Sequence, residues 1–234
     1  PPKSRPLIGP QITWPCLGKL FNKILNTRLE QKCVREGLIN DCQGSSKKGS
    51  RTADHLLVIK FLIDKYVSGA NKKLFVCFFD IRRAFDTIPR NLLFYTILKN
   101  YKIGGNYLKI LQKIYSSNEI FVKLSGGLCE PFVSSVGVLQ GQTNSPLLFN
   151  LFVNKIADVF DQSCDPVEID QSEQSCLLWS DDLFCVSQSA EGLQNVIDKV
   201  YSFYTSLGLQ LNSKKTKVII FNKSGKVLKG YSFL

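Results

Sequence analysis

This chain of 234 residues lacks several features that mark common enzyme classes. It has a single histidine, His55, which disfavours mechanisms in which a histidine acts as the base or activates a nucleophile. None of its eight cysteines forms a CxxC pair, which argues against a zinc site or a disulfide framework. It also contains no methionine, even at position 1, and we therefore expect a fragment of a longer polypeptide.

Long hydrophobic segments are missing as well. No apolar run approaches the roughly 20 residues that a membrane-spanning helix needs, and residues 1–10 contain no apolar signal core. We therefore expect no membrane partner and an intracellular location, in the nucleus or the cytoplasm, where thiols stay reduced. The composition, with 44% hydrophobic and 21% charged residues, is typical of a globular protein.

The net charge of +11 is unevenly distributed. Residues 1–75 carry 14 Lys and Arg against 5 Asp and Glu, whereas residues 151–234 carry 8 against 10. A basic first part joined to a carboxylate-bearing second part suits a polyanion held over a metal site. On charge alone, an ordinary basic surface is the better explanation.

Apolar periodicity and turn residues predict an α+β fold with helices on one face of a sheet. Helices are expected at 17–38, 52–67, about 145–160 and 190–206, and strands at 74–79, 119–124, 128–136 and 218–221. Residues 176–186 are expected to form a strand, an Asp-Asp turn and a second strand. The two segments 119–124 and 128–136 form a predicted hairpin. Thr87 is predicted to cap a helix that begins at Pro89, and residues 161–174 to be an irregular acidic insertion.

Aspartates follow apolar, strand-like runs at two places, at Asp80 and at the pair Asp181 and Asp182. A carboxylate at such a position loses water, and this is costly unless a partner compensates. A divalent cation compensates well, because its charge cancels theirs and hard oxygens suit Mg²⁺. We expect Asp80 and Asp181 to bridge two Mg²⁺ ions, with Mn²⁺ as an alternative ion, and Asp182 to be the third ligand. For any one of these residues alone, a turn cap is the better explanation.

Several segments then resemble a known family in their order and spacing. Four are similar to the successive palm motifs of reverse transcriptases from non-LTR (LINE-type) retrotransposons: FFDIRRAFD, GVLQGQTNSPLLFN, LLWSDDLFCV and LGLQLNSKKTKVIIF. Two more resemble the fingers segments of that family: LGKLFNKILNTRL and GSRTADHL. The resemblance therefore covers nearly the whole chain.

The resemblance implies a right-hand polymerase. Its palm, an antiparallel sheet backed by helices, would span 74–234, with a fingers-like hairpin near 119–136, and a partial, mainly helical fingers segment would span 1–73. No thumb is expected in this chain. The implied activity is RNA-directed DNA polymerisation with Mg²⁺, an RNA template, a DNA primer and deoxynucleoside triphosphates. Endonuclease and thumb would be other domains of a longer polyprotein.

The resemblance also implies roles for individual residues. The metal ligands would be Asp80, Asp181 and Asp182, and the backbone of Ile81 would face the triphosphate. Phe85 would exclude a ribose 2′-hydroxyl by its bulk, although core packing is a serious alternative for any phenylalanine.

Four more residues are candidates for contacts with substrate. Gln140 and Gly141 would let the template-primer and the incoming nucleotide approach the backbone, which glycine permits; an ordinary turn is the alternative. Lys215 would donate a proton to pyrophosphate, and Arg51 would clamp the triphosphate with its fork of donors. For both cations, a solvated surface position is the alternative.

The chain departs from the family pattern at four places. Trp179 and Ser180 stand where the family has tyrosine and alanine, and Leu139 stands where it has arginine. Gln142 replaces a common cysteine, and residues 44–46 replace a glycine-phenylalanine pair. A catalytically silent, decayed remnant that binds nucleic acid therefore stays an alternative. A different two-metal phosphotransferase, such as a nucleotide cyclase, is a third.

Overall fold

The computed structural model describes residues 16–45, 49–69, 72–116, 119–121, 123–124, 127–226 and 230–233. Residues 1–15 of the predicted fingers segment lie outside this range, as do residues 125–126 at the predicted hairpin turn. The division into fingers and palm at residue 73 stays a prediction.

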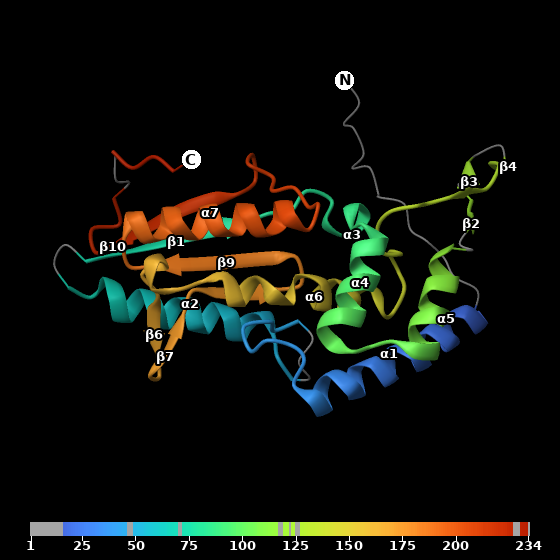
Figure 1. The fold of residues 1–234 in the computed structure, drawn as a ribbon. Helices are drawn as coiled ribbons and strands as arrows, with labels where there is room; N and C mark the ends of the chain where they lie inside the picture. Colours follow the sequence, from blue (N-terminus) through green and yellow to red (C-terminus); the bar gives the residue numbers. More distant parts are fainter. Residues whose placement is uncertain are drawn as a thin grey trace, which may run out of the picture.

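A four-stranded antiparallel sheet forms the centre of the described chain, in the order β10-β1-β9-β8 (Figure 1). Its strands are β1 (Lys73–Phe79), β8 (Cys176–Trp179), β9 (Asp182–Ser187) and β10 (Lys217–Asn222). β1 lies between β9 and β10, with Phe79 opposite Leu183. Because β1 and β9 are antiparallel, the end of β1 lies beside the start of β9. The register therefore brings two distant acidic segments to the same end of the sheet.

Both faces of β1 are buried over most of the strand, as its uninterrupted apolar sequence predicts, and Phe78 near its end is exposed. Phe75, Cys77 and Phe79 face the main core, which includes residues of α4 (Arg90–Tyr101), α6 (Ser145–Val153) and α7 (Ala190–Ser206). Leu74 and Val76 face a smaller cluster with α2 (Thr52–Val67). Figure 1 shows α7 and α2 on opposite sides of the sheet. The expectation of helices on one face alone is therefore wrong, because the apolar side chains of α2 cover part of the other face.

Most predicted helices are present. α2 and α7 have the predicted bounds, and α1 (Cys16–Glu36) ends two residues early. The helix expected at about 145–160 divides into α6 and a 3-10 helix, η1 (Asn154–Val159). α5 (Gly105–Ser116) was not predicted, although Leu108, Leu111 and Tyr115 are buried at helical spacing. No helix in the described ranges is long and apolar enough to cross a membrane.

Two local predictions are wrong. Thr87 does not cap α4, because it is the last residue of a short helix, α3 (Ala84–Thr87). Its hydroxyl donates to the Arg83 carbonyl at 3.2 Å, and Pro89 occupies the N-cap position of α4. The insertion at 161–174 is not irregular. It forms a 3-10 turn, η2 (Gln162–Cys164), and a hairpin of β6 (Val167–Ile169) and β7 (Ser172–Gln174).

The hairpin predicted over 119–136 is present with shorter strands. β2 (Glu119–Ile120) pairs with β5 (Phe132–Val133), and β3 (Lys123–Leu124) pairs with β4 (Gly127–Leu128). It extends from the end of α5, away from the central sheet (Figure 1).

Candidate active site

An open cleft of about 410 Å³ lies at the end of the sheet where β1 terminates. Its lining residues are Asp80, Ile81, Arg82, Arg83, Ala84, Phe85, Asp86, Gln140, Asp181, Asn212 and Lys215. Six residues predicted from the sequence are thus brought together: Asp80, Ile81, Phe85, Gln140, Asp181 and Lys215. They come from four separate segments of the chain.

Asp181 reaches this cleft from a tight turn. Trp179 pairs with Asp182 across β8 and β9, which leaves a two-residue loop of Ser180 and Asp181. Ser180 has a φ of 60°, in the left-handed region that non-glycine residues seldom occupy. The turn and the end of β1 then present two carboxylates, Asp80 and Asp181, to one space.

The Asp80 carboxylate has partners from the segment before β10. The Asn212 side-chain amide donates to Asp80 Oδ2 at 2.8 Å, and Lys215 Nζ lies 3.7 Å from Asp80 Oδ1. The backbone is also fixed, because Asn212 N donates to Asp80 O at 2.8 Å and Asp80 N donates to Thr216 Oγ1 at 3.3 Å. The carboxylate is therefore oriented, while its side chain remains 33% exposed to the cleft.

Asp181 has a different electrostatic environment. Burial raises the pKa of its carboxyl group above the usual range, and the charges of Asp182 and Asp80 raise it further. The ionised form is thus disfavoured until a positive charge arrives. This is the condition that a bound cation relieves.

The donor set fits a metal ion that substrate helps to bind. No group of three acidic, histidine or cysteine side chains in the described ranges forms a ready-made metal site. Mg²⁺, however, is commonly held by one or two carboxylates together with substrate phosphates and water. Asp80 and Asp181, both lining the cleft, supply such a pair.

Asp182, the predicted third ligand, lies just after the turn. It is exposed, it is the first residue of β9, and it is not among the cleft residues in the described chain. Side chains alternate along a strand, so Asp182 shares the face of Phe184 rather than that of Leu183. Its role as a ligand stays a prediction.

Phe85 and Ile81 are partly core residues. The Phe85 ring stacks on Phe149, with 4.8 Å between ring centroids, while Phe85 also lines the cleft. Ile81 is 5% exposed and pairs with Leu211 in an isolated antiparallel bridge. Core packing and a contact with substrate are therefore compatible for both residues.

Gln140 and Gly141 form the turn before α6. The Gln140 side-chain amide donates to Asp86 Oδ1 at 2.6 Å, which ties this turn to α3. Gly141 has a φ of 84°, a conformation that glycine adopts at little cost. Gly141 is not among the cleft residues in the described chain.

Arg51 is exposed and precedes α2, where its backbone N–H donates to Asp54 Oδ2 at 2.7 Å. It too is absent from the described lining of the cleft. Two other arginines, Arg82 and Arg83, do line it. Sequence reasoning passed over them, although both stand within the FFDIRRAFD motif. It also missed Asn212, an uncharged residue whose contact with Asp80 is visible only in three dimensions.

Two of the residues that depart from the family pattern, Trp179 and Leu139, pack within the fold. The Trp179 ring packs edge-to-face against His55, with centroids 5.4 Å apart, and does not line the described cleft. Leu139 is 2% exposed and belongs to the main core.

Comparison with known proteins identifies the family. A profile of the reverse transcriptase (RNA-dependent DNA polymerase) family matches residues 3–232. The chain belongs to this family. The resemblance to reverse transcriptases of non-LTR retrotransposons is confirmed, because the similar curated proteins include polyproteins of R2 elements.

Two of these relatives show the extent of the match. The Pol polyprotein from the type-2 retrotransposable element R2DM of Drosophila melanogaster is 25% identical over 218 residues, which cover 92% of this chain and 19% of that polyprotein. The Pol polyprotein from the type-1 retrotransposable element R2 of Popillia japonica is 26% identical over 216 residues, covering 90% and 29%. The reverse transcriptase chain thus spans less than a third of the length of these relatives.

Solved structures support the fold. An apo telomerase from Candida tropicalis, truncated from the C-terminal domain, matches with a TM-score of 0.62 at 16% identity and covers 90% of this chain and 43% of that one. At this identity the likeness concerns the fold alone. The predicted α+β palm of a polymerase is confirmed.

Proposed function

We propose that this reverse transcriptase domain is an RNA-directed DNA polymerase that adds deoxynucleotides to a primer as part of a longer polypeptide. The observation that carries the proposal is the placement of Asp80 and Asp181 in one cleft with Lys215, Gln140 and Phe85. These residues come from the four motifs whose order suggested the family.

In this proposal the carboxylates of Asp80 and Asp181 hold two Mg²⁺ ions, with Asp182 as a further ligand. When bound, Mg²⁺ activates the attacking primer hydroxyl and neutralises charge on the transferred phosphate and the leaving pyrophosphate. Asn212 keeps the Asp80 carboxylate in one orientation through its 2.8 Å hydrogen bond.

Other side chains act on the incoming nucleotide. Phe85 occupies the space that a ribose 2′-hydroxyl would need, and its stacking on Phe149 keeps the ring from turning away. Lys215 donates a proton to the departing pyrophosphate oxygen. Arg82 and Arg83 are better placed than Arg51 to bind the triphosphate, because both line the cleft.

The basic part of the chain would hold the RNA template and the DNA primer. Residues 1–75 carry an excess of nine positive charges, from 14 basic and 5 acidic residues. Binding of phosphates releases counterions, so RNA affinity should fall steeply as salt rises. The proposed setting is intracellular, with endonuclease and thumb domains elsewhere in the polyprotein.

Primer extension on an RNA template tests the proposal. The chain and its parent polypeptide are incubated with a DNA primer, deoxynucleoside triphosphates and Mg²⁺ or Mn²⁺, and RNA binding is measured in parallel. Template-dependent extension that Asp80→Asn abolishes would support it. RNA binding without extension by either protein would favour the silent remnant, and template-independent phosphoryl transfer would favour another two-metal enzyme.

A further inference from the structure

A segment before α2 extends the central sheet beyond β8. Gln43 pairs with Leu178 in a parallel bridge, Leu178 N donates to Cys42 O at 2.8 Å, and Gly44 N donates to Leu178 O at 2.9 Å. Residues 42–44 thus run alongside the strand that leads into the Asp181 turn. They come from the predicted fingers segment, far from β8 in the sequence.

The side chain of Gln43 reaches from this segment to the turn itself. Gln43 is 2% exposed, and its Oε1 accepts from Ser180 N at 3.1 Å and from Ser45 Oγ at 2.8 Å. Ser45 Oγ lies 3.1 Å from Ser180 N and is its second acceptor. The backbone N–H of Ser180, the residue before Asp181, therefore donates to the side chains of Gln43 and Ser45.

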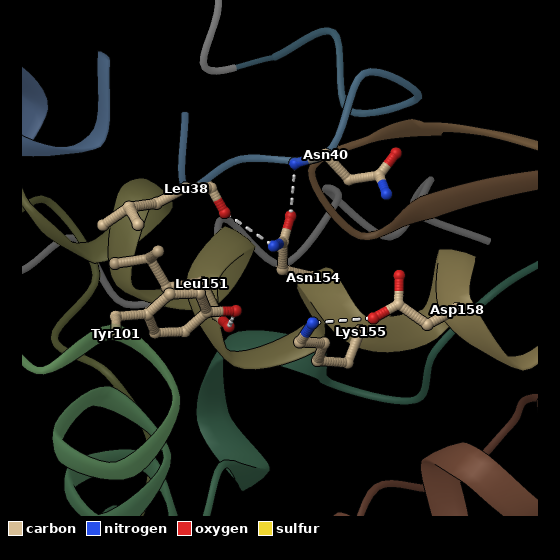
Figure 2. A network of polar contacts seen from close by, with 7 residues as sticks. All are labelled: Leu38, Asn40, Tyr101, Leu151, Asn154, Lys155 and Asp158. Carbon is tan, nitrogen blue, oxygen red and sulfur yellow. Dashed lines mark hydrogen bonds and ion pairs between the residues drawn. The ribbon is translucent and has the colours of Figure 1, made fainter. Parts of the chain in front are cut away.

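The segment is held in turn by two asparagines of α6 and η1. The Asn150 amide donates to Ser45 Oγ at 2.9 Å. Figure 2 shows Asn154 between Leu38 and Asn40, where it donates to Leu38 O and accepts from Asn40 N, both at 2.8 Å. Asn150 and Asn154 are four residues apart and so lie on one side of the helix.

Packing leaves this segment little freedom. A Cβ atom added at Gly44 would lie 2.6 Å from His55 Nε2 and 3.0 Å from Trp179 Cε3. Two of the departures from the family pattern, one including Gly44 and the other including Trp179, therefore meet in one place. The hydroxyl of Ser45 acts there on the backbone of Ser180.

We propose that Gln43 and Ser45 are positioning residues that set the place of the Asp181 carboxylate through the Ser180 amide. The role rests on the proposed function, because it matters for catalysis only if Asp181 binds a metal. Neither residue touches substrate or metal. Each acts through a turn whose left-handed Ser180 has few other conformations that keep the carboxylate in the cleft.

The test compares two substitutions of equal length. Gln43→Met removes the acceptor, whereas Gln43→Glu keeps an oxygen at the same place. Mn²⁺ affinity of the chain, titrated by electron paramagnetic resonance, should fall about 10-fold in Gln43→Met, in the range seen when groups that orient metal ligands are removed. Gln43→Glu should restore most of it. Gln188→Met, at an exposed glutamine bonded to the Pro166 carbonyl, is the matched control and should bind like wild type.

Hydrogen exchange at the Ser180 amide gives a readout independent of metal. The exchange rate should rise in Gln43→Met. Ser45→Ala, a smaller change at a half-buried residue, should raise the exchange rate less, and it replaces Gln43→Met in the test if that variant fails to fold. Wild-type Mn²⁺ affinity in folded Gln43→Met, or in Ser45→Ala where only that variant folds, would overturn the positioning role while leaving the polymerase proposal intact. A wild-type chain that binds no Mn²⁺ and extends no primer, alone or in its parent polypeptide, would overturn both.

Discussion

The two carboxylates of the cleft are supported in different ways. Asp80 is held directly, because Asn212 and Lys215 contact its carboxylate oxygens. Asp181 is held indirectly, because Gln43 and Ser45 bind the backbone of the preceding residue. The first support comes from a segment after the turn in sequence, and the second from a segment near the beginning of the chain.

This difference shows how a metal site can depend on the whole fold. A side-chain hydrogen bond orients the Asp80 carboxylate but also occupies one of its oxygens. Backbone support leaves the Asp181 side chain to the cleft, where burial and the charges of Asp182 and Asp80 raise the pKa of its carboxyl group. Asp80 is thus the oriented ligand, and Asp181 the one whose charge most needs a cation.

The largest expected effect is the loss of either cleft carboxylate. Asp80→Asn should lower primer extension on the order of 10³-fold, because a metal ligand contributes several kcal/mol to the transition state. RNA affinity, measured by filter binding at fixed salt, should stay near wild type because phosphate contacts supply it. Asp181→Asn should behave alike despite its different support. Extension by either variant at the wild-type rate would remove that residue from the metal site.

Selection between ribose and deoxyribose is predicted to depend on Phe85, which follows β1 in the cleft. Phe85→Ala should raise the use of ribonucleotides relative to deoxynucleotides by about 10- to 200-fold, the discrimination that small steric changes provide. Loss of the stack on Phe149 should also cost about 1 kcal/mol of stability. Competitive single-nucleotide incorporation measures the ratio, with Phe85→Tyr as the bulky control. Unchanged selectivity in folded Phe85→Ala would assign Phe85 to core packing alone.

Direct support of Asp80 can be removed without touching a carboxylate. Asn212→Leu should lower kcat about 10-fold with little change in the KM for deoxynucleotide, because the freed carboxylate samples unproductive orientations. Steady-state extension assays measure both constants. Asn195→Leu, on α7 and bonded to the Ser163 carbonyl, is the control. A rise in KM with unchanged kcat would instead place Asn212 in nucleotide binding.

The smallest effect concerns stability. The folded state raises the Asp181 pKa above its ordinary value of 3.8, so ionisation of this carboxyl destabilises the fold as pH rises through the folded pKa. Asp181→Asn should therefore raise the free energy of unfolding at pH 7 by under about 1 kcal/mol, because solvent screens a partly exposed group. Tm should rise slightly as a result. The gain should shrink below pH 3.8, where the wild-type carboxyl is protonated in both states. Thermal melts across pH measure it, and a gain that is equal at all pH values would contradict the electrostatic explanation.

The sequence predicted the strands and helices that carry the site residues better than it predicted the hydrogen bonds that hold these residues in place. β1 and a turn between β8 and β9 were expected because an aspartate after an apolar, strand-like sequence is a local pattern. The predicted Asp-Asp turn falls one residue earlier, at Ser180 and Asp181, because Asp182 already pairs with Trp179. The bounds of α2 and α7 matched because helical periodicity is local as well. The start of α4 was misplaced, since Thr87 bonds within α3 instead of capping the next helix.

The contacts between distant segments could not be read in this way. Asn212 lies 132 residues from Asp80, and Gln43 lies 137 residues from Ser180, so no local pattern links the members of either pair. The outward position of Asp182 likewise depends on where the two-residue turn falls in the β8–β9 register. A shift of one residue would exchange the faces of the two aspartates.

By itself, the sequence determined which chemistry is available: acidic groups placed after apolar strands, a phenylalanine beside them and a basic first part, all set by residue type and local order. Only the tertiary structure decided that Asp80 and Asp181 share one cleft and that segments at the two opposite edges of the sheet hold them there. The physical reason is that hydrogen bonds and strand register act between atoms close in space, whatever their separation along the chain.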